Sequence, residues 1–197
     1  QAPFEALRHH VLPERIAANR DRRQLALWSA ACSTGQEPYS LAILLDDAFP
    51  ELAGWQVDLV ATDLSAGALE RARAGRYSAL EVNRGLPLRY LDAYFRAEPA
   101  GFRLVERVRE KVRFSACNLV GPWPPLAPQD VILLRNVLIY FDPPSRRRVL
   151  AAAVARLRPG GYLVLGTAET TRAPASGLAA VTVGSATVYR REDPRGR

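Results

Sequence analysis

The sequence predicts a doubly wound α/β fold, in which helices cover both faces of a mainly parallel sheet. Short apolar runs alternate with longer amphipathic segments along most of the chain, as expected where helices join parallel strands. The runs at Leu25–Ala31 and Val131–Leu134 are apolar almost throughout, which is typical of central strands buried on both faces. A chain of 197 residues with 48% hydrophobic content is long enough for one domain with a substantial core.

The first half of the chain predicts two strand–helix units. The strand Leu25–Ala31 precedes a helix over Pro38–Phe49, because proline suits a first helical turn and leucines then recur at helical spacing. A second strand, Val57–Thr62, precedes a helix over Ser65–Ala74. Ser65 is a suitable N-cap for this helix, and Gly75 a suitable end. We expect a further helix over Phe4–Ala18, lying across the front edge of the sheet.

The alternation breaks between Arg76 and Glu110, where turn residues and scattered aromatics replace periodic segments. Short strands are expected at Phe102–Val105 and Val112–Ala116. We therefore predict a small inserted β-subdomain within residues 76–116.

The alternation then resumes and ends in a hairpin. The expected elements are the strand Val131–Leu134, a helix over Ser145–Leu157, a helix stop at Pro159-Gly160-Gly161, the strand Tyr162–Leu165, and an antiparallel pair formed by Val181–Val183 and Thr187–Tyr189. Three strand–helix units followed by a terminal hairpin suit a Rossmann-like doubly wound sheet.

Composition argues against several classes of function. The net charge is +7, but the basic residues are spread along the chain and Lys111 is the only lysine, so the charge does not indicate a nucleic-acid surface. An anionic protein substrate remains compatible with it. Cys32 and Cys117 have no metal-site spacing. No apolar run reaches the roughly 18 residues of a membrane span. We expect a monomeric, cytoplasmic protein without a bound metal.

The loop after the first predicted strand is a candidate ligand site, because ligands of doubly wound sheets lie beyond the carboxyl ends of the strands. It contains Gly35 among small residues and lacks the GxGxxG pattern of dinucleotide binding. Asp63 follows the second strand, where an acid commonly accepts hydrogen bonds from ribose hydroxyls. The pair favours an adenosine-containing ligand without a diphosphate. Alternatively, the loop is a plain strand-to-helix turn and Asp63 caps a helix.

Two later strands are followed by amide side chains, Asn118 and Asn136. Asparagine at a strand end is often only a turn former. Asn136 is more informative, because Arg135 and Asn136 interrupt the otherwise apolar run from Val131 to Phe141, and buried polar groups need partners. An adenine or an amino-acid carboxylate at the sheet edge would be such a partner.

These motifs together resemble one family. They are Trp28–Ala42 (WSAACSTGQEPYSLA), Ala61–Ser65 (ATDLS), Asn118-Leu119, Arg135–Asp142 (RNVLIYFD) and Pro159–Leu165 (PGGYLVL). Their order and strings are similar to those of the bacterial chemotaxis methyltransferases of the CheR type, over nearly the whole chain. The resemblance implies a class I S-adenosylmethionine-dependent methyltransferase fold. It also implies methyl transfer from S-adenosyl-L-methionine to glutamate side chains of chemoreceptors, which leaves a methyl ester and S-adenosyl-L-homocysteine.

The resemblance assigns expected roles to individual residues. The cofactor-binding positions would be Glu37, Asp63, Asn118, Leu119, Arg135 and Asn136. Tyr140 would be an active-site tyrosine that helps to position the reacting group. The irregular segment from Arg76 to Glu110 falls near the small β-subdomain of the family, which in some members docks on receptors.

Two departures qualify the resemblance. Gln36 stands where many relatives have a first glutamate, although Glu37 is kept. The sequence starts at Gln1 without methionine, and it lacks both an upstream Asn-x-Thr-x-Phe-Phe-Arg segment and the usual amino-terminal helical domain. We expect translation to begin further upstream. The alternative function is a cofactor-binding regulatory or interaction module of a signalling protein that does not transfer methyl groups.

Overall fold

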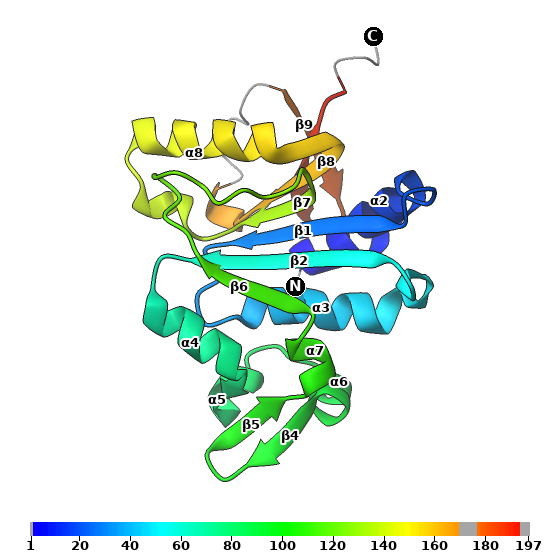
Figure 1. The fold of residues 1–197 in the computed structure, drawn as a ribbon, viewed down its shortest axis with the longest axis vertical. Helices are drawn as coiled ribbons and strands as arrows, with labels where there is room; N and C mark the ends of the chain where they lie inside the picture. The colour runs from blue at the N-terminus through cyan, green and yellow to red at the C-terminus, as the bar shows by residue number, and fades with distance from the viewer. Residues whose placement is uncertain (1, 170–176, 194–197) are drawn as a thin grey trace.

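A seven-stranded sheet crosses the centre of the computed structural model, which describes residues 2–169 and 177–193 (Figure 1). The strand order is β6-β2-β1-β7-β8-β10-β9. The strands are β1 (Gln24–Ala30), β2 (Gln56–Asp63), β6 (Val112–Ala116), β7 (Gln129–Leu134), β8 (Leu157–Leu165), β9 (Leu178–Val183) and β10 (Ala186–Arg191). The first five run parallel, and β10 pairs antiparallel with both β8 and β9. The predicted doubly wound sheet with a terminal hairpin is confirmed.

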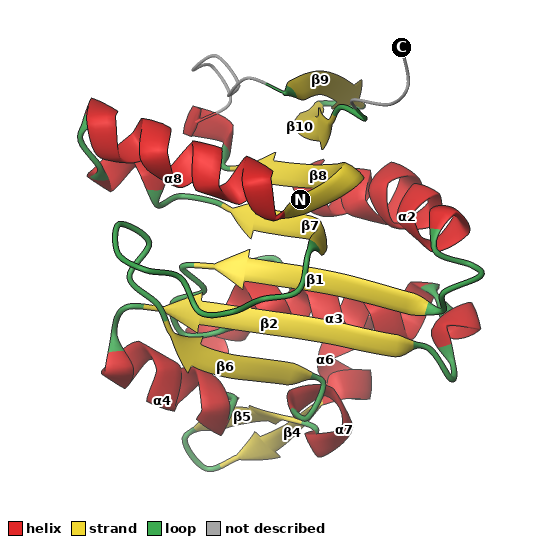
Figure 2. Ribbon diagram, turned by 45° about the horizontal axis from the view of Figure 1, so that its top comes forward, coloured by secondary structure: helices red, strands yellow, loops and turns green. Residues whose placement is uncertain are grey.

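Helices cover both faces of this sheet (Figure 2). They include α2 (Leu12–Ala18), α3 (Gln36–Ala48), α4 (Ala66–Ala74) and α8 (Pro143–Arg156). Alternate strand residues point to opposite faces, so Leu25 and Leu27 of β1 join a core cluster with α2 and α3. Trp28 and Ala30 join a second cluster with α8. Winding therefore reverses between β1 and β7, and the carboxyl ends of these two strands are where doubly wound sheets bind their ligands.

The ends of two helices follow from their sequence. Ser65 caps α4 by accepting a hydrogen bond from the Ala68 amide (3.2 Å), and Gly75 ends the helix in the left-handed conformation (φ 60°), both as predicted. Helix α3 begins at Gln36, two residues before the predicted start. Gly35 makes this possible, because its φ of 91° closes the preceding turn. Pro38 still lies in the first turn, where helical amides have no intrahelical acceptor.

The helical segment at the start of the chain lies over a face of the sheet and not across its front edge. It consists of α1 (Ala2–Ala6), a π-helical turn (Leu7–Val11) and α2. Its buried residues Leu7 and Leu12 belong to the cluster that contains Tyr162 of β8 and Val188 of β10. The predicted helix is therefore confirmed, and its predicted position is wrong. The reason is that its apolar side is continuous enough to be buried against strands.

Strand β8 begins at Leu157, five residues before the predicted start at Tyr162. The Pro159-Gly160-Gly161 segment does not separate helix from strand, because it forms an irregularity within β8: Leu157 pairs with Gln129, whereas Tyr162 pairs with Val131. Gly160 has a φ of 72°, which a bulged strand tolerates in glycine. The predicted helix stop at this segment is therefore wrong, although the predicted helix end at Leu157 is within one residue of the end of α8 at Arg156.

A separate three-stranded antiparallel sheet lies beside the main one, in the order β3-β5-β4 (Figure 1). Its strands are β3 (Arg76–Tyr77), β4 (Phe95–Glu98) and β5 (Gly101–Leu104), with the short helices α5 (Ala79–Val82), α6 (Leu88–Tyr94) and α7 (Glu106–Arg109) around them. Val112–Ala116 does not belong to this sheet. It pairs parallel with β2 as the outer strand of the large sheet, because α7 returns the chain there.

No helix in residues 2–169 and 177–193 has both the length and the apolar character needed to cross a membrane.

Candidate functional site

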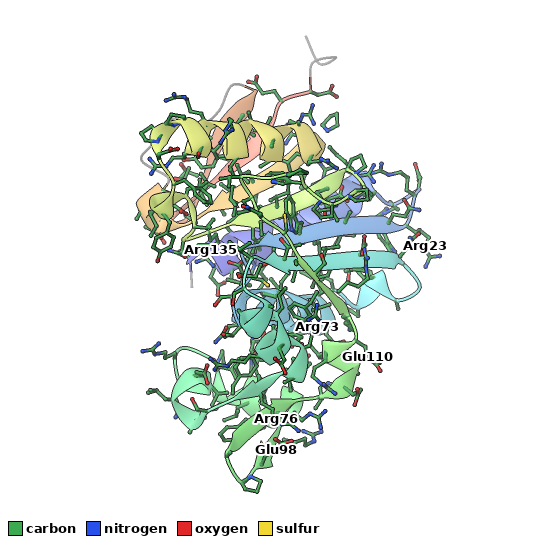
Figure 3. All side chains as sticks on the ribbon, turned by 60° about the vertical axis from the view of Figure 1, so that its left-hand side comes forward. Arg23, Arg73, Arg76, Glu98, Glu110 and Arg135 are labelled. Carbon is green, nitrogen blue, oxygen red and sulfur yellow. The ribbon has the colours of Figure 1, made fainter. Side chains whose placement is uncertain are left out.

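Strained backbone gathers at the carboxyl ends of the central strands. Only four non-glycine residues in the described part of the chain have positive φ, and three of them lie here: Ala31 (60°), Ser33 (51°) and Asn136 (58°). The fourth, Arg23 (49°), precedes β1 at the opposite end of the sheet, and Figure 3 shows Arg23 and Arg135 on opposite sides of the molecule. Such conformations cost free energy and concentrate at functional sites. We call this end of the sheet, formed by the residues that follow β1, β2, β6, β7 and β8, the strand-end edge.

Asp63, the last residue of β2, connects two loops of this edge. Its Oδ2 accepts a hydrogen bond from the Ser33 amide (2.8 Å), and its Oδ1 accepts one from the Ser65 amide (2.9 Å). The Asp63 carbonyl also accepts from the Cys117 amide (3.0 Å), which brings Asn118 beside it. Each carboxylate oxygen can accept a second hydrogen bond. Asp63 is therefore a fixed, half-buried acceptor at the strand-end edge.

Glu37 and Arg135 form an ion pair below the edge, with 2.8 Å between Arg135 Nη1 and Glu37 Oε2. The Ser29 hydroxyl of β1 donates to Glu37 Oε1 (2.7 Å). Burial raises the pKa of Glu37, whereas Arg135 and Ser29 oppose this rise. The structure thus joins two predicted cofactor-binding residues, from α3 and from the end of β7, into one largely compensated pair.

Asn136 follows Arg135 in a left-handed conformation with its side chain exposed. Its backbone amide donates to the carboxylate of Glu169 (2.8 Å), which holds the strained residue in place. Tyr140 lies four residues further on, in a 3-10 turn over Leu138–Tyr140, and is 79% exposed. The two predicted residues therefore belong to one short segment at the rim of the edge.

Asn118 and Leu119 follow β6 and have different surroundings. Asn118 is exposed, and its Oδ1 accepts a hydrogen bond from the Val120 amide (3.1 Å), the turn-forming contact that was the alternative interpretation. Leu119 is 7% exposed and packs in the second core cluster. Asn118 is thus an exposed turn residue beside Asp63, and Leu119 belongs to the core beneath this turn.

The edge contains no activated thiol. Cys32 is buried in the loop after β1, and burial raises its pKa to about 12, so it is a neutral thiol near pH 7. No cluster of metal-ligating side chains occurs within residues 2–169 and 177–193. The groups described above that a ligand could contact at this edge are carboxylates, amides and the exposed phenol of Tyr140.

The sequence profile of the CheR methyltransferase, SAM-binding domain, matches residues 1–182. The chain belongs to this family.

Curated relatives of the CheR domain agree with this assignment. The chain is 44% identical to chemotaxis protein methyltransferase 1 of Pseudomonas aeruginosa over 85% of its own length and 62% of that protein. It is 40% identical to chemotaxis protein methyltransferase 1 of Vibrio cholerae, over 85% and 61%. The probable biofilm formation methyltransferase WspC of Pseudomonas aeruginosa is 38% identical over 93% of this chain and 44% of that protein. The chain thus spans about three fifths or less of these relatives.

The side chains of this CheR domain fit S-adenosylmethionine, an adenosine joined to an amino acid without phosphate. Asp63 has carboxylate oxygens of the kind that accept hydrogen bonds from ribose hydroxyls, and the turn at Asn118 lies beside it. Among the described residues, Arg135 Nε is a buried donor that has no hydrogen-bond partner. It lies next to Asn136, whose exposed amide could bind the amino-acid end. A diphosphate would instead require the glycine-rich turn that this loop lacks.

Two residues of the strand-end edge were not predicted from the sequence. Ser29 is buried near the carboxyl end of β1, where a polar residue in an apolar run signals a specific partner, here Glu37. Glu169 lies in a 3-10 turn (Thr167–Glu169) after β8 and is 4% exposed. Its only sequence signal is an acid closely following a buried strand, because three of its four partners are backbone amides about 30 residues earlier in the chain.

Proposed function

We propose that this protein transfers the methyl group of S-adenosylmethionine to glutamate side-chain carboxylates of bacterial chemoreceptors, forming a methyl ester. The observation that carries this proposal is the charge arrangement at the strand-end edge. The Arg135 cation is paired with Glu37, while the exposed group at the rim, Tyr140, is a neutral hydrogen-bond donor. Such a rim is suited to an anionic substrate that must remain nucleophilic.

The reaction places few chemical demands on the protein. When bound, S-adenosylmethionine supplies a methyl group on a positively charged sulfur, which is a good leaving group. A glutamate carboxylate is already ionised at neutral pH, so no general base is needed. This agrees with the neutral Cys32 and with two histidines, His9 and His10, that lie on the first helices away from the strand ends. The carboxylate oxygen would form its bond to the methyl carbon as the carbon–sulfur bond breaks, so holding oxygen, carbon and sulfur in line should supply much of the rate enhancement.

Tyr140 suits this task better than a free cation does. A strong ion pair would stabilise the substrate carboxylate in the ground state and slow its attack. A phenol donates one hydrogen bond and leaves the second carboxylate oxygen free to react. The cofactor would lie behind Tyr140. It would be held by Asp63, Asn118, Leu119, Asn136 and the Glu37–Arg135 pair.

The names of the relatives support the proposed partner, since several are chemotaxis protein methyltransferases. The partner would be the cytoplasmic part of a methyl-accepting chemoreceptor, and the protein would act in the cytoplasm. The positive net charge favours approach to an acidic protein segment.

The test combines two measurements on the full-length protein. Calorimetry with S-adenosylhomocysteine measures cofactor binding, and transfer of radiolabelled methyl to receptor cytoplasmic fragments measures catalysis. We expect both, and we expect Tyr140→Phe to lower kcat by about tenfold while the Kd for S-adenosylhomocysteine stays within about twofold. Binding without transfer would instead favour a regulatory module. Equal losses of binding and turnover in Tyr140→Phe would contradict the role given to Tyr140.

A further inference from the structure

One buried carboxylate gathers four backbone amides from two strand ends. Glu169 accepts hydrogen bonds from the amides of Gly166 (2.8 Å), Asn136 (2.8 Å), Val137 (3.0 Å) and Leu138 (2.8 Å). Two oxygens thus satisfy the Gly166 amide and three consecutive amides, those of residues 136–138. The contacts with Leu138 and Gly166 are buried, where an amide without an acceptor would cost free energy. The Glu169 carboxylate connects the end of β8 to the segment that follows β7.

Arg146 acts on the other end of the same segment. Its Nε donates to the Leu138 carbonyl (3.0 Å), and its Nη2 donates to the Phe141 carbonyl (3.0 Å). The planar guanidinium fixes both carbonyls at once, a geometry that lysine does not reproduce. Arg146 lies in the first turns of α8, whose N-cap Asp142 directly follows Phe141.

The two side chains therefore hold opposite sides of one turn. Glu169 binds its amides as far as Leu138, and Arg146 binds its carbonyls from Leu138 onward. Tyr140 lies between these contacts and is 79% exposed, so side-chain packing does little to orient it. Its position depends mainly on the backbone that carries it. Asn136, held in a left-handed conformation, depends on Glu169 in the same way.

We propose that Glu169 and Arg146 are positioning residues that fix the segment from Asn136 to Tyr140 against the strand-end edge. Glu169 sets the part that includes Asn136 and serves cofactor binding. Arg146 sets the part that includes Tyr140 and serves methyl transfer. The catalytic half of this proposal rests on the proposed function, whereas the structural half does not.

The experiment uses the full-length protein with Arg146→Gln, Arg146→Lys and Glu169→Gln. Arg147→Gln is the matched control, because it removes the same charge from the next, exposed position of α8. Amide hydrogen exchange of residues 136–141 reports on the turn, calorimetry reports on S-adenosylhomocysteine binding, and methyl transfer is measured with and without Tyr140→Phe. Circular dichroism checks that each variant is folded, and Arg146→Lys is the milder change if Arg146→Gln fails that check.

We expect Arg146→Gln to accelerate exchange in the turn and to lower kcat about tenfold, with the Kd for S-adenosylhomocysteine within about twofold. In the Tyr140→Phe background the same change should lower kcat less than twofold, which a purely structural role would not produce. Glu169→Gln should accelerate exchange at residues 136–138 and raise this Kd about tenfold. Arg147→Gln should change none of these values.

Three results would overturn the proposal: unchanged exchange in the turn, equal kcat losses with and without Tyr140, or an effect of Arg147→Gln as large as that of Arg146→Gln. If the unmodified protein binds S-adenosylhomocysteine but transfers no methyl group, the proposed function fails on its own. Exchange in the turn and the Kd of Glu169→Gln then still decide whether the two residues hold the segment.

Discussion

The acids at the strand-end edge are held by donors of different kinds, and this difference sets what each can do. Glu37 is paired with a cation and a hydroxyl, Arg135 and Ser29, so its charge is largely compensated within the protein. Asp63 receives only backbone amides, from Ser33 and Ser65. Amides orient a carboxylate without removing its net charge. Asp63 is therefore the acid that remains able to attract hydroxyl donors from a ligand.

Asp63→Asn tests this distinction. An asparagine offers one oxygen and one amide, so one of the two backbone amides would face another donor. The loss of charge-assisted hydrogen bonds, about 1.5–3 kcal/mol, predicts a Kd for S-adenosylhomocysteine raised roughly 10- to 100-fold in calorimetry. Asp58→Asn is the control, because Asp58 lies on the same strand and pairs with Arg113 at the surface. Similar losses in both variants would contradict a local role for Asp63.

The Glu37–Arg135 pair should contribute to the free energy of unfolding. Removing either partner leaves the other charge with little solvent, since the side chains are 17% and 21% exposed. We expect Glu37→Gln and Arg135→Met each to lower the free energy of unfolding by about 2 kcal/mol, measured in urea. The double variant should be less destabilised than the sum, because no unpaired charge remains. Additive losses would mean that the pair contributes nothing as a pair.

At the scale of elements, the sequence predicts a helix or strand boundary where that boundary depends on contacts between residues close together in the chain. The caps of α4, Ser65 and Gly75, could be predicted because a cap depends on residues within one turn. The strand ends that carry Asp63 and Asn136 followed from apolar runs. The irregular pairing of β8 with β7 could not be predicted, since it depends on register across the sheet. The role of Glu169 could not be predicted either, since three of its four partners lie more than 30 residues earlier.

An irregular segment, residues 117–128, takes the place of a helix between β6 and β7, and crosses the face of the sheet in front of β1 (Figure 2). Trp123 anchors it. The ring meets Trp28 of β1 edge to face, with centroids 4.9 Å apart, and its Nε1 donates to the Leu119 carbonyl (2.9 Å). The segment begins with Asn118, so its anchoring reaches the predicted cofactor site.

Trp123→Ala should therefore loosen the whole segment. Because the ring is half-buried, we expect a loss of about 2 kcal/mol in the free energy of unfolding, below the range for fully buried aromatics. Hydrogen exchange should rise over residues 117–128, and S-adenosylhomocysteine should bind more weakly. Trp123→Phe keeps most of the ring contact and should lose about half as much stability. Unchanged exchange in Trp123→Ala would show that other contacts anchor the segment.

At the scale of the molecule, the end of α3 connects the small antiparallel sheet to the rest. Asp46 accepts a hydrogen bond from Tyr94 of α6 (3.1 Å) and pairs with Lys111, which precedes β6. Asp47 accepts from Tyr90 of α6 (2.7 Å) and pairs with Arg8 of the first helices (3.1 Å). Figure 1 shows α3 between the large sheet and α6. Two adjacent acids thus join three parts of the chain.

The double variant Asp46→Asn/Asp47→Asn should loosen the small sheet while the large one stays intact. Partly exposed pairs contribute up to about 1 kcal/mol each, so we expect roughly fivefold faster hydrogen exchange over residues 76–104 and no change in β1. Asp92→Asn, which removes an exposed charge from α6, is the control and should change little. Equally faster exchange in β1 would instead indicate global destabilisation.

The difference in hydrogen exchange between the unmodified protein and the double variant should disappear at low pH. Burial raises the pKa of Asp46, but hydrogen bonds and charge from Lys111 and Tyr94 outweigh it and lower the pKa below 3.8. The hydrogen bond from Tyr90, followed by that from Arg8, lowers the pKa of Asp47. A carboxyl whose pKa is lowered in the folded protein stabilises the folded state at pH values above its ordinary pKa. This stabilisation is lost as pH falls through the lowered pKa.

The amides of the small sheet in the unmodified protein should therefore exchange more slowly than those of the double variant from pH 7 to about pH 4. As pH falls from 3.8 through the lowered pKa values of Asp46 and Asp47 the two should converge, because protonation removes the charges that the variant lacks. A difference that persists at pH 2 would show that the asparagines disturb the junction by packing and not by charge.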